Sequence, residues 1–197
     1  IDTFESDTGI SDDEVSLTSK YKTAVVLNRK AYIGNLQQDG KVYSDKMVKS
    51  VTGLFDTFPF TTSDVDVAIS DGDEIIKLEG YADRILQFKR NVMYLINVSQ
   101  DIEFLEDKFV YKGVTHPAAT CRTDYGIAWV NKYGCYLYDG KQVLNLLERK
   151  GLRLIGEEDW DDFVTYDSII GYSPQSRDIV VIDSCKFNKN RYIYNLI

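Results

Sequence analysis

The sequence predicts a mainly β protein, organised as a propeller-like array of four-stranded antiparallel blades with a short inserted helix. Two observations predict this class. Short polar turns precede apolar strands that begin at Ala31, Ile85, Ile127 and Ile179, so the pattern recurs at intervals of 54, 42 and 52 residues, and propeller blades repeat at roughly 40 to 50 residues. The 14 Tyr and 9 Phe, against 3 Pro and 2 Met, favour pleated sheet, on which aromatic side chains pack well.

Residues 1–20 are rich in Asp, Glu, Ser and Thr and have little apolar periodicity. Such a segment buries too little apolar surface to order itself, so we expect a flexible acidic arm or linker. Residues 21–197 are expected to form the propeller-like domain, with about three to four blades, some of them partial. The chain starts with Ile, and residues 191–197 look like an interrupted strand, so we expect a segment of a longer polypeptide.

The first half of the chain is expected to contain short strands that are separated by polar turns. Val65, Val67 and Ile69 alternate with polar neighbours, as in a half-buried strand, and Asp71-Gly72 supplies the following turn. Residues 50–59 are expected to be a loop with buried aromatic side chains. The predicted strands are 23–27, 31–34, 41–43, 65–69, 74–81, 85–89 and 92–98.

The second half is expected to contain one complete blade, formed by strands at 118–122, 127–131, 135–138 and 142–147. Residues 156–163 are expected to form the inserted helix, because their acidic residues lie near the N-terminal end, where the helix dipole favours them. Strands at 167–172, 178–183 and 191–196 are expected to begin another blade that the chain does not finish.

The net charge of −8 argues against tight binding of DNA or RNA, because that affinity comes mostly from Lys and Arg. A mildly acidic wall would still let a polyanion slide past without sticking. No apolar run approaches the ~20 residues of a membrane helix, and the acidic N-terminus does not resemble a secretory signal. We therefore expect no membrane insertion.

The three cysteines, Cys121, Cys135 and Cys185, are odd in number and form no Cys-x-x-Cys pair. Each lies in a predicted strand, so they are interpreted as small buried apolar groups rather than as disulfide, metal or nucleophile residues. Cys121 and Cys135 could face each other across a hairpin. A reducing cytoplasm is the expected place of folding.

Two patterns that resemble catalytic or phosphate sites fail on inspection. The only histidine, His116, precedes Pro117 and has no nucleophile motif near it, so it is interpreted as a loop residue. The glycines Gly134 and Gly140 are separated by one residue too many for a phosphate-binding loop, and Gln142 replaces the required Ser or Thr. This segment is predicted to be a β-hairpin.

Two groups of acidic residues are candidates for ligand binding. The first does not match an EF-hand loop, which needs glycine at its sixth position, so its members are interpreted as turn residues, with a non-standard Ca²⁺ site as the alternative. The second lacks the contrast between a protonated and an ionised carboxyl group that glycoside hydrolysis needs, and it is interpreted as a charged surface. The groups are Asp64, Asp66, Asp71 and Asp73, and Glu157, Glu158, Asp159, Asp161 and Asp162.

The sequon Asn97-Val98-Ser99 has no consequence without secretion. We therefore expect no catalytic, cofactor-binding or metal-binding residue, no cofactor and no enzymatic activity.

Four segments resemble bacteriophage virion proteins of the tail-tube or nozzle type: GLFDTFP at 53–59, DGDEIIKL at 71–78, LQFK at 86–89 and GCYLYDG at 134–140. The resemblance spans residues 20 to 185. It implies β-propeller domains in a protein that forms a ring at the phage tail, through which the genome passes. It assigns no role to any individual residue.

The expected function is therefore structural, as part of the tail of a tailed phage virion that folds in the host cytoplasm. The expected partners are other virion proteins, further copies of this chain in a ring, and passing DNA that is not bound specifically. The alternative is a propeller-type module that binds or hydrolyses carbohydrate during host recognition, because exposed aromatic rings can stack on sugars.

Overall fold

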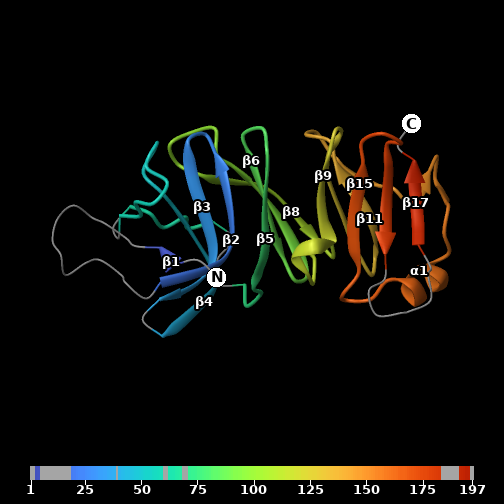
Figure 1. Ribbon diagram of the computed structural model, residues 1–197, viewed down its shortest axis with the longest axis horizontal. Coiled ribbons are helices and arrows are strands. Elements are labelled where there is room, and N and C mark those ends of the chain that lie inside the picture. Colours follow the sequence, from blue (N-terminus) through green and yellow to red (C-terminus); the bar gives the residue numbers. More distant parts are fainter. Residues whose placement is uncertain are drawn as a thin grey trace. The chain divides into compact units, whose positions relative to one another are not determined.

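The computed structural model describes residues 3–4, 19–38, 40–59, 62–67, 71–182 and 191–195 (Figure 1). The protein is mainly β, with several small antiparallel sheets. The described residues do not form a closed propeller. The chain divides into two compact units, Ile1–Val110 and Tyr111–Ile197.

The first unit contains two four-stranded sheets, in which the strands follow one another in chain order and all neighbours are antiparallel. Each sheet is therefore a meander. The first consists of β1 (Thr3–Phe4), β2 (Ser19–Leu27), β3 (Lys30–Gln38) and β4 (Lys41–Lys49); the second of β5 (Ile75–Tyr81), β6 (Arg84–Lys89), β7 (Val92–Asn97) and β8 (Phe104–Val110).

Turn chemistry explains the tight connection between β2 and β3. Asn28 and Arg29 have φ values of 49° and 61°, the pair of positive values that a two-residue hairpin turn of type I′ requires. This turn matches the twist of the two strands and sets their register, in which Leu27 lies opposite Lys30. A bulge between Gly34 and Leu36 then shifts the pairing of β3 with β4.

The core of the first unit lies between its two sheets. Tyr32 and Met47 of the first sheet belong to the same buried cluster as Ile75, Leu78 and Ile85 of the second. Alternate residues of a strand point to one face, so this cluster is the shared apolar face of two meanders. Burial of such side chains contributes about 25 cal/mol per Å² of apolar surface.

A glycine in β5 permits this close approach. A Cβ atom at Gly80 would lie 3.0 Å from the side chain of Leu27 in β2. Two hydrogen bonds also cross between the sheets: the Leu78 N–H donates to Thr23 Oγ1 at 2.9 Å, and Asn35 Nδ2 donates to the Ile75 carbonyl at 2.8 Å. These bonds satisfy buried polar groups and fix the register of one sheet on the other.

Both sheets bury side chains on their other faces as well. In the first sheet, Ile33, Leu36 and Val48 form a second cluster with Phe58. Phe58 lies in the predicted loop at 50–59, so the prediction of buried aromatics is confirmed for Phe58, whereas Phe55 is 50% exposed. The second sheet has four buried residues on its other face, namely Leu86, Phe88, Met93 and Leu95.

The second unit contains a four-stranded meander, a two-stranded ribbon, a short helix and a three-stranded sheet. Gly126 begins the second strand of the meander at a φ of 146°, and a Cβ atom there would lie 1.9 Å from the Tyr138 carbonyl oxygen. The elements are β9 (Thr120–Thr123), β10 (Gly126–Asn131), β11 (Gly134–Tyr138), β12 (Val143–Asn145), β13 (Glu148–Arg149), β14 (Leu152–Arg153), α1 (Glu157–Phe163), β15 (Ile169–Ser173), β16 (Asp178–Ile182) and β17 (Arg191–Asn195).

Most predicted elements are confirmed. The predicted strands at 85–89, 92–98, 127–131 and 135–138 correspond to β6, β7, β10 and β11, and the predicted helix is α1. The strands predicted at 23–27, 31–34 and 41–43 are longer in the structure, because pairing continues through polar residues. Within the expected arm at 1–20, Thr3–Phe4 pairs with Ser19 and Lys20. Ile69 and Cys185 lie outside the described residues.

The prediction of a strand at 65–69 is wrong for 65–67, the part that the structure describes, which lies in a loop at 62–67. These residues form a loop that touches β4 through one bridge, Val48 to Asp64. Val65 is buried because its N–H donates to the Met47 carbonyl at 3.1 Å, which places its side chain in the core between the sheets. The apolar alternation in this segment therefore belongs to a loop that packs along strand β4.

Three elements were not predicted correctly, and each lacks a clear strand pattern in the sequence. Strand β8 is an edge strand whose side chains are almost all exposed, so it lacks apolar alternation. The strands β13 and β14 of the ribbon are also mostly exposed, so they lack apolar alternation as well. Residues 118–119 of the predicted strand 118–122 belong to a 3₁₀ helix (Pro117–Ala119), because Pro117 begins the turn and His116 caps it.

We expect Gln87→Leu to stabilise the protein. The side chain of Gln87 is fully buried in β6, and neither its Nε2 nor its Oε1 has a hydrogen-bond partner among the described residues. An unsatisfied buried polar group costs about 1 to 3 kcal/mol, so leucine should raise the free energy of unfolding, measured by urea denaturation, by about 1 kcal/mol or more.

Gln37→Leu is the matched control, because Gln37 lies exposed in β3, and it should change stability by less than about 0.5 kcal/mol. A clear loss of stability in Gln87→Leu would show that the buried amide is satisfied in solution.

Candidate functional site

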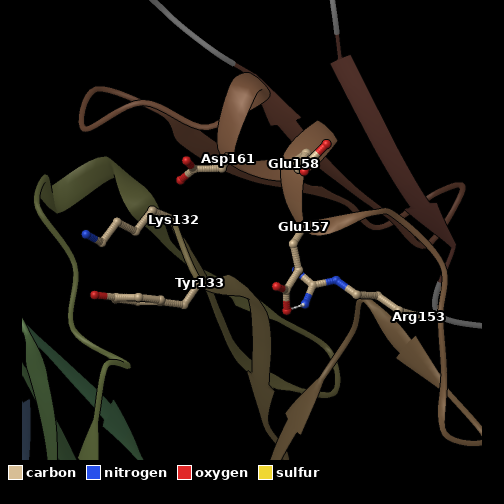
Figure 2. Close-up of a pocket in the computed structure, with 6 residues that line it drawn as sticks. All are labelled: Lys132, Tyr133, Arg153, Glu157, Glu158 and Asp161. Carbon is tan, nitrogen blue, oxygen red and sulfur yellow. Dashed lines mark hydrogen bonds and ion pairs between the residues drawn. The ribbon is translucent and has the colours of Figure 1, made fainter.

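A cleft of about 320 Å³ in the second unit is the candidate site (Figure 2). It lies among the β10–β11 turn, β14 and helix α1. Its lining residues are Lys132, Tyr133, Arg153, Glu157, Glu158 and Asp161. The cleft therefore combines an aromatic ring with side chains of both charges.

Asn131 holds the walls of the cleft in place. Its Oδ1 accepts hydrogen bonds from the N–H groups of Tyr133 (2.9 Å) and Gly134 (3.2 Å), which closes the β10–β11 turn. Its Nδ2 donates to the carbonyls of Tyr111 and Gly113 at 3.0 and 2.8 Å. Its own carbonyl accepts from Trp160 Nε1 at 3.0 Å, which joins α1 to the turn.

Trp160 and Phe163 fix the orientation of the helix. Both are buried, and their rings lie 6.0 Å apart on the same side of α1. The opposite side carries the acidic residues that the sequence assigns to a charged surface. Glu157, Glu158 and Asp161 are exposed, as predicted, but they also form one wall of the cleft.

Arg153 and Glu157 close one side of the cleft. Arg153 Nη1 lies 2.5 Å from Glu157 Oε1, and Arg153 Nε donates to the Ile155 carbonyl at 2.9 Å. In Figure 2 the carboxylate of Glu157 points toward Arg153, whereas Lys132, Tyr133 and Asp161 project in another direction. Arg153 is thus already paired, which leaves Lys132 as the cation for a ligand.

Tyr133 forms the aromatic side of the cleft, and Tyr111 packs against it from outside the lining. The rings of Tyr133 and Tyr111 have centroids 5.1 Å apart and are tilted by 58°. The two residues are 42% and 60% exposed. The Lys132 ammonium lies 4.9 Å from the centre of the Tyr133 ring, a cation–π distance.

Sequence reasoning missed Lys132, Tyr133 and Arg153. The available signal was the turn Asn131-Lys132-Tyr133-Gly134, in which a large aromatic residue occupies an exposed hairpin position. Its neighbours across the cleft lie 20 or more residues away in the chain, so only the folded structure brings them together.

A second polar cluster lies in the first unit around Asp71. Its Oδ1 accepts from Lys89 Nζ at 2.6 Å, and its Oδ2 accepts from the Tyr94 hydroxyl at 2.7 Å. The Lys89 side chain is fully buried. Burial raises the pKa of Asp71, but the hydrogen bonds from Lys89, Tyr94 and Asp73 outweigh it and the pKa is lowered. Burial and the bond to Asp71 raise the pKa of Tyr94 to about 12.

Two further members of this acidic group, which the sequence analysis interprets as turn residues, have local roles in the structure. Asp73 accepts from the N–H groups of Arg90 and Asn91, and so joins the loop before β5 to the β6–β7 turn. Asp64 pairs with Lys46 at 2.8 Å. No group of three or more His, Cys, Asp or Glu in the described parts of the chain is arranged to hold a metal ion.

His116 and the two described cysteines have structural surroundings. His116 Nδ1 accepts the Ala118 N–H at 3.1 Å and caps the 3₁₀ helix. Cys121 and Cys135 are not joined by a disulfide. They do not face each other across a hairpin, because β10 lies between their strands. Burial raises the pKa of the Cys135 thiol, which disfavours the nucleophilic thiolate.

The segment that resembles a phosphate loop is a strand and a turn. Gly134–Tyr138 is β11, and Asp139 Oδ1 accepts from the N–H groups of Lys141 and Gln142 at 2.8 and 2.9 Å. The prediction of a hairpin is confirmed, since β11 pairs with β12.

Asn97 of the sequon is only 9% exposed. Its amide oxygen accepts from the N–H and hydroxyl of Ser99, and its Nδ2 donates to Glu106 at 3.0 Å. These contacts let Asn97, the last residue of β7, hold the segment that follows the strand.

Comparison with protein-family models gave no match, and comparison with curated proteins gave no significant match. Among the described residues, no helix has the length and apolar character needed to cross a bilayer.

We expect Asp71→Asn to destabilise the first unit by about 3 kcal/mol, because it removes the carboxylate that neutralises a fully buried ammonium. The double variant Asp71→Asn, Lys89→Met should recover much of this loss, since it removes both charges. Urea denaturation of the single and double variants measures the effect. Equal loss in both variants would contradict the assignment of the cost to Lys89.

Acid should destabilise the first unit through Asp71 and through two other carboxylates with charged partners, Glu74 beside Arg90 and Glu106 beside Arg84. The pKa values of Asp71, Glu74 and Glu106 are lowered in the folded protein, so the stability they contribute is present above their ordinary pKa values of about 4 and is lost as the pH falls through the folded values. Unfolding measured from about pH 6 down to about pH 2 should show this loss. A smaller loss is expected in the Asp71→Asn, Lys89→Met variant, and an unchanged pH profile there would exclude Asp71 as a contributor.

Proposed function

We propose that this protein is a structural component of a tailed bacteriophage virion, and that it belongs to the tail tube or nozzle through which the genome passes. One structural observation carries most weight beside the sequence resemblance: three successive four-stranded antiparallel meanders occur in strict chain order, followed by a three-stranded sheet. Repetition of one small sheet is a way of building a rigid scaffold with protected edges.

In this proposal each meander is a propeller blade. An interior blade must be covered on both faces, and the second sheet has buried apolar side chains on both, with Leu78 and Ile85 on one face and Leu86 and Phe88 on the other. Closure of the propeller would then need blades from the remaining polypeptide or from a neighbouring copy. A ring of copies around a channel follows from the resemblance.

The charge of the chain supports passage of DNA without specific binding. The net charge is −8, so an acidic channel wall would repel the phosphate backbone rather than hold it. The proposed partners are further copies of this chain and other virion proteins.

A carbohydrate-binding module in host recognition is the second candidate. The observation that favours it is the pair of exposed tyrosines beside the polar cleft.

We expect the purified chain to form rings with a central opening as its concentration rises. Native mass spectrometry gives the number of copies, and negative-stain electron microscopy shows the shape. The rings should not retard duplex DNA in a gel at low salt, where electrostatic binding is strongest. A monomer at every concentration, or retention of DNA that salt abolishes, would contradict the proposal.

A further inference from the structure

We propose that the cleft between the β10–β11 turn and α1 binds the ring of a neutral hexose or N-acetylhexosamine. This inference gives residues and a ligand class to the second candidate function and does not depend on the virion proposal. It starts from the combination in Figure 2, where Tyr133, Lys132 and Asp161 line one opening. A sugar ring has an apolar C–H face and a rim of hydroxyl groups, and the cleft offers a partner for each.

Tyr133 supplies the apolar contact, and Tyr111 supports it from outside the cleft. Tyr133 is 42% exposed, and Tyr111 packs against it with centroids 5.1 Å apart. The contact with Tyr111, together with the Asn131 hydrogen bonds that close the turn, holds the Tyr133 side chain in place before a ligand arrives. An aromatic side chain that is already ordered loses little conformational entropy on binding.

A hydrogen-bond acceptor and a hydrogen-bond donor lie beside the Tyr133 ring. The carboxylate of Asp161 accepts hydrogen bonds, and the Lys132 ammonium donates them. Adjacent sugar hydroxyls can act as donors and acceptors together, so they suit a wall that presents both. The paired Arg153 and Glu157 form a fixed side wall, because Arg153 is also bonded to the Ile155 carbonyl.

The same residues disfavour other classes of ligand. A phosphate or nucleic acid would meet three carboxylates and two cations, of which Arg153 is already paired with Glu157. An apolar ligand would have to dehydrate exposed charges. A cleft of about 320 Å³ lies at the small end of ligand sites, which span about 300 to 1,000 Å³, and this size suits one or two sugar rings.

The cleft is a binding site without hydrolysis. Cleavage of a glycosidic bond requires one carboxyl group that stays protonated in a shielded environment beside an ionised partner. Glu157, Glu158 and Asp161 are all exposed on one helix, and Glu157 is neutralised by Arg153. The ligand therefore leaves unchanged.

The test is saturation-transfer NMR of the full chain with methyl β-glucoside, methyl β-galactoside and methyl N-acetyl-β-glucosaminide as probes. At least one probe should bind with a dissociation constant of about 1 mM, as expected for so small a ligand. Tyr133→Ala should weaken its binding by about tenfold, since a stacked aromatic contact is lost, and Asp161→Asn should also weaken it.

Tyr125→Ala is the matched control, because Tyr125 is 38% exposed in the β9–β10 turn and does not line the cleft; it should bind as the unmodified chain does. Absence of transfer with all three probes, or equal binding in Tyr133→Ala and Tyr125→Ala, would overturn the inference. Native mass spectrometry of the Tyr133→Ala variant, which measures whether its copies still assemble into rings, tests the virion proposal separately. Release of methanol from any probe would contradict binding without hydrolysis.

Discussion

A four-stranded antiparallel meander cannot bury its apolar face alone, and the first unit depends on the solution to this constraint. Its two meanders cover each other, with Tyr32 and Met47 meeting Ile75, Leu78 and Ile85 in one cluster. The hydrophobic contact is not directional, whereas the bonds from Leu78 to Thr23 and from Asn35 to the Ile75 carbonyl are. Apolar burial thus supplies the stability of the pair, and a few buried polar groups set its register.

Polar groups inside this unit have two contrasting environments. Lys89 is neutralised by Asp71, which also accepts from Tyr94, so its burial depends on a complete network. Gln87 lies in the same strand two residues earlier, on the same face, without a hydrogen-bond partner among the described residues. A satisfied network adds specificity, while an unsatisfied amide only lowers stability. The first unit therefore contains a specific buried ion pair and also a residue, Gln87, that lowers its stability.

The second unit uses one residue to organise its candidate site. Asn131 closes the β10–β11 turn, holds the segment at Tyr111 and receives the Trp160 indole. The cleft is therefore a consequence of how the turn and α1 are joined. A structural role in a ring and recognition of a sugar at an exposed cleft are compatible, since the first needs the sheets and the second needs only the turn and the helix.

Local sequence signals determined the strands that carry a clear apolar pattern or a defined turn. The strands β6, β7, β10 and β11, and the helix with Trp160 and Phe163 on one side, could be predicted because each pattern is complete within a few residues. Edge strand β8 and the ribbon of β13 and β14 could not, because their side chains are mostly exposed and leave no apolar pattern. The loop at Val65 could not, because its conformation depends on a distant strand, β4. The same reason applies to the sites. The acidic residues of α1 were evident from the sequence, but only tertiary packing placed Tyr133 and Lys132 opposite them and enclosed Lys89 with Asp71. Proximity in space between a loop and a strand, or between a turn and a helix, leaves no periodicity in the chain.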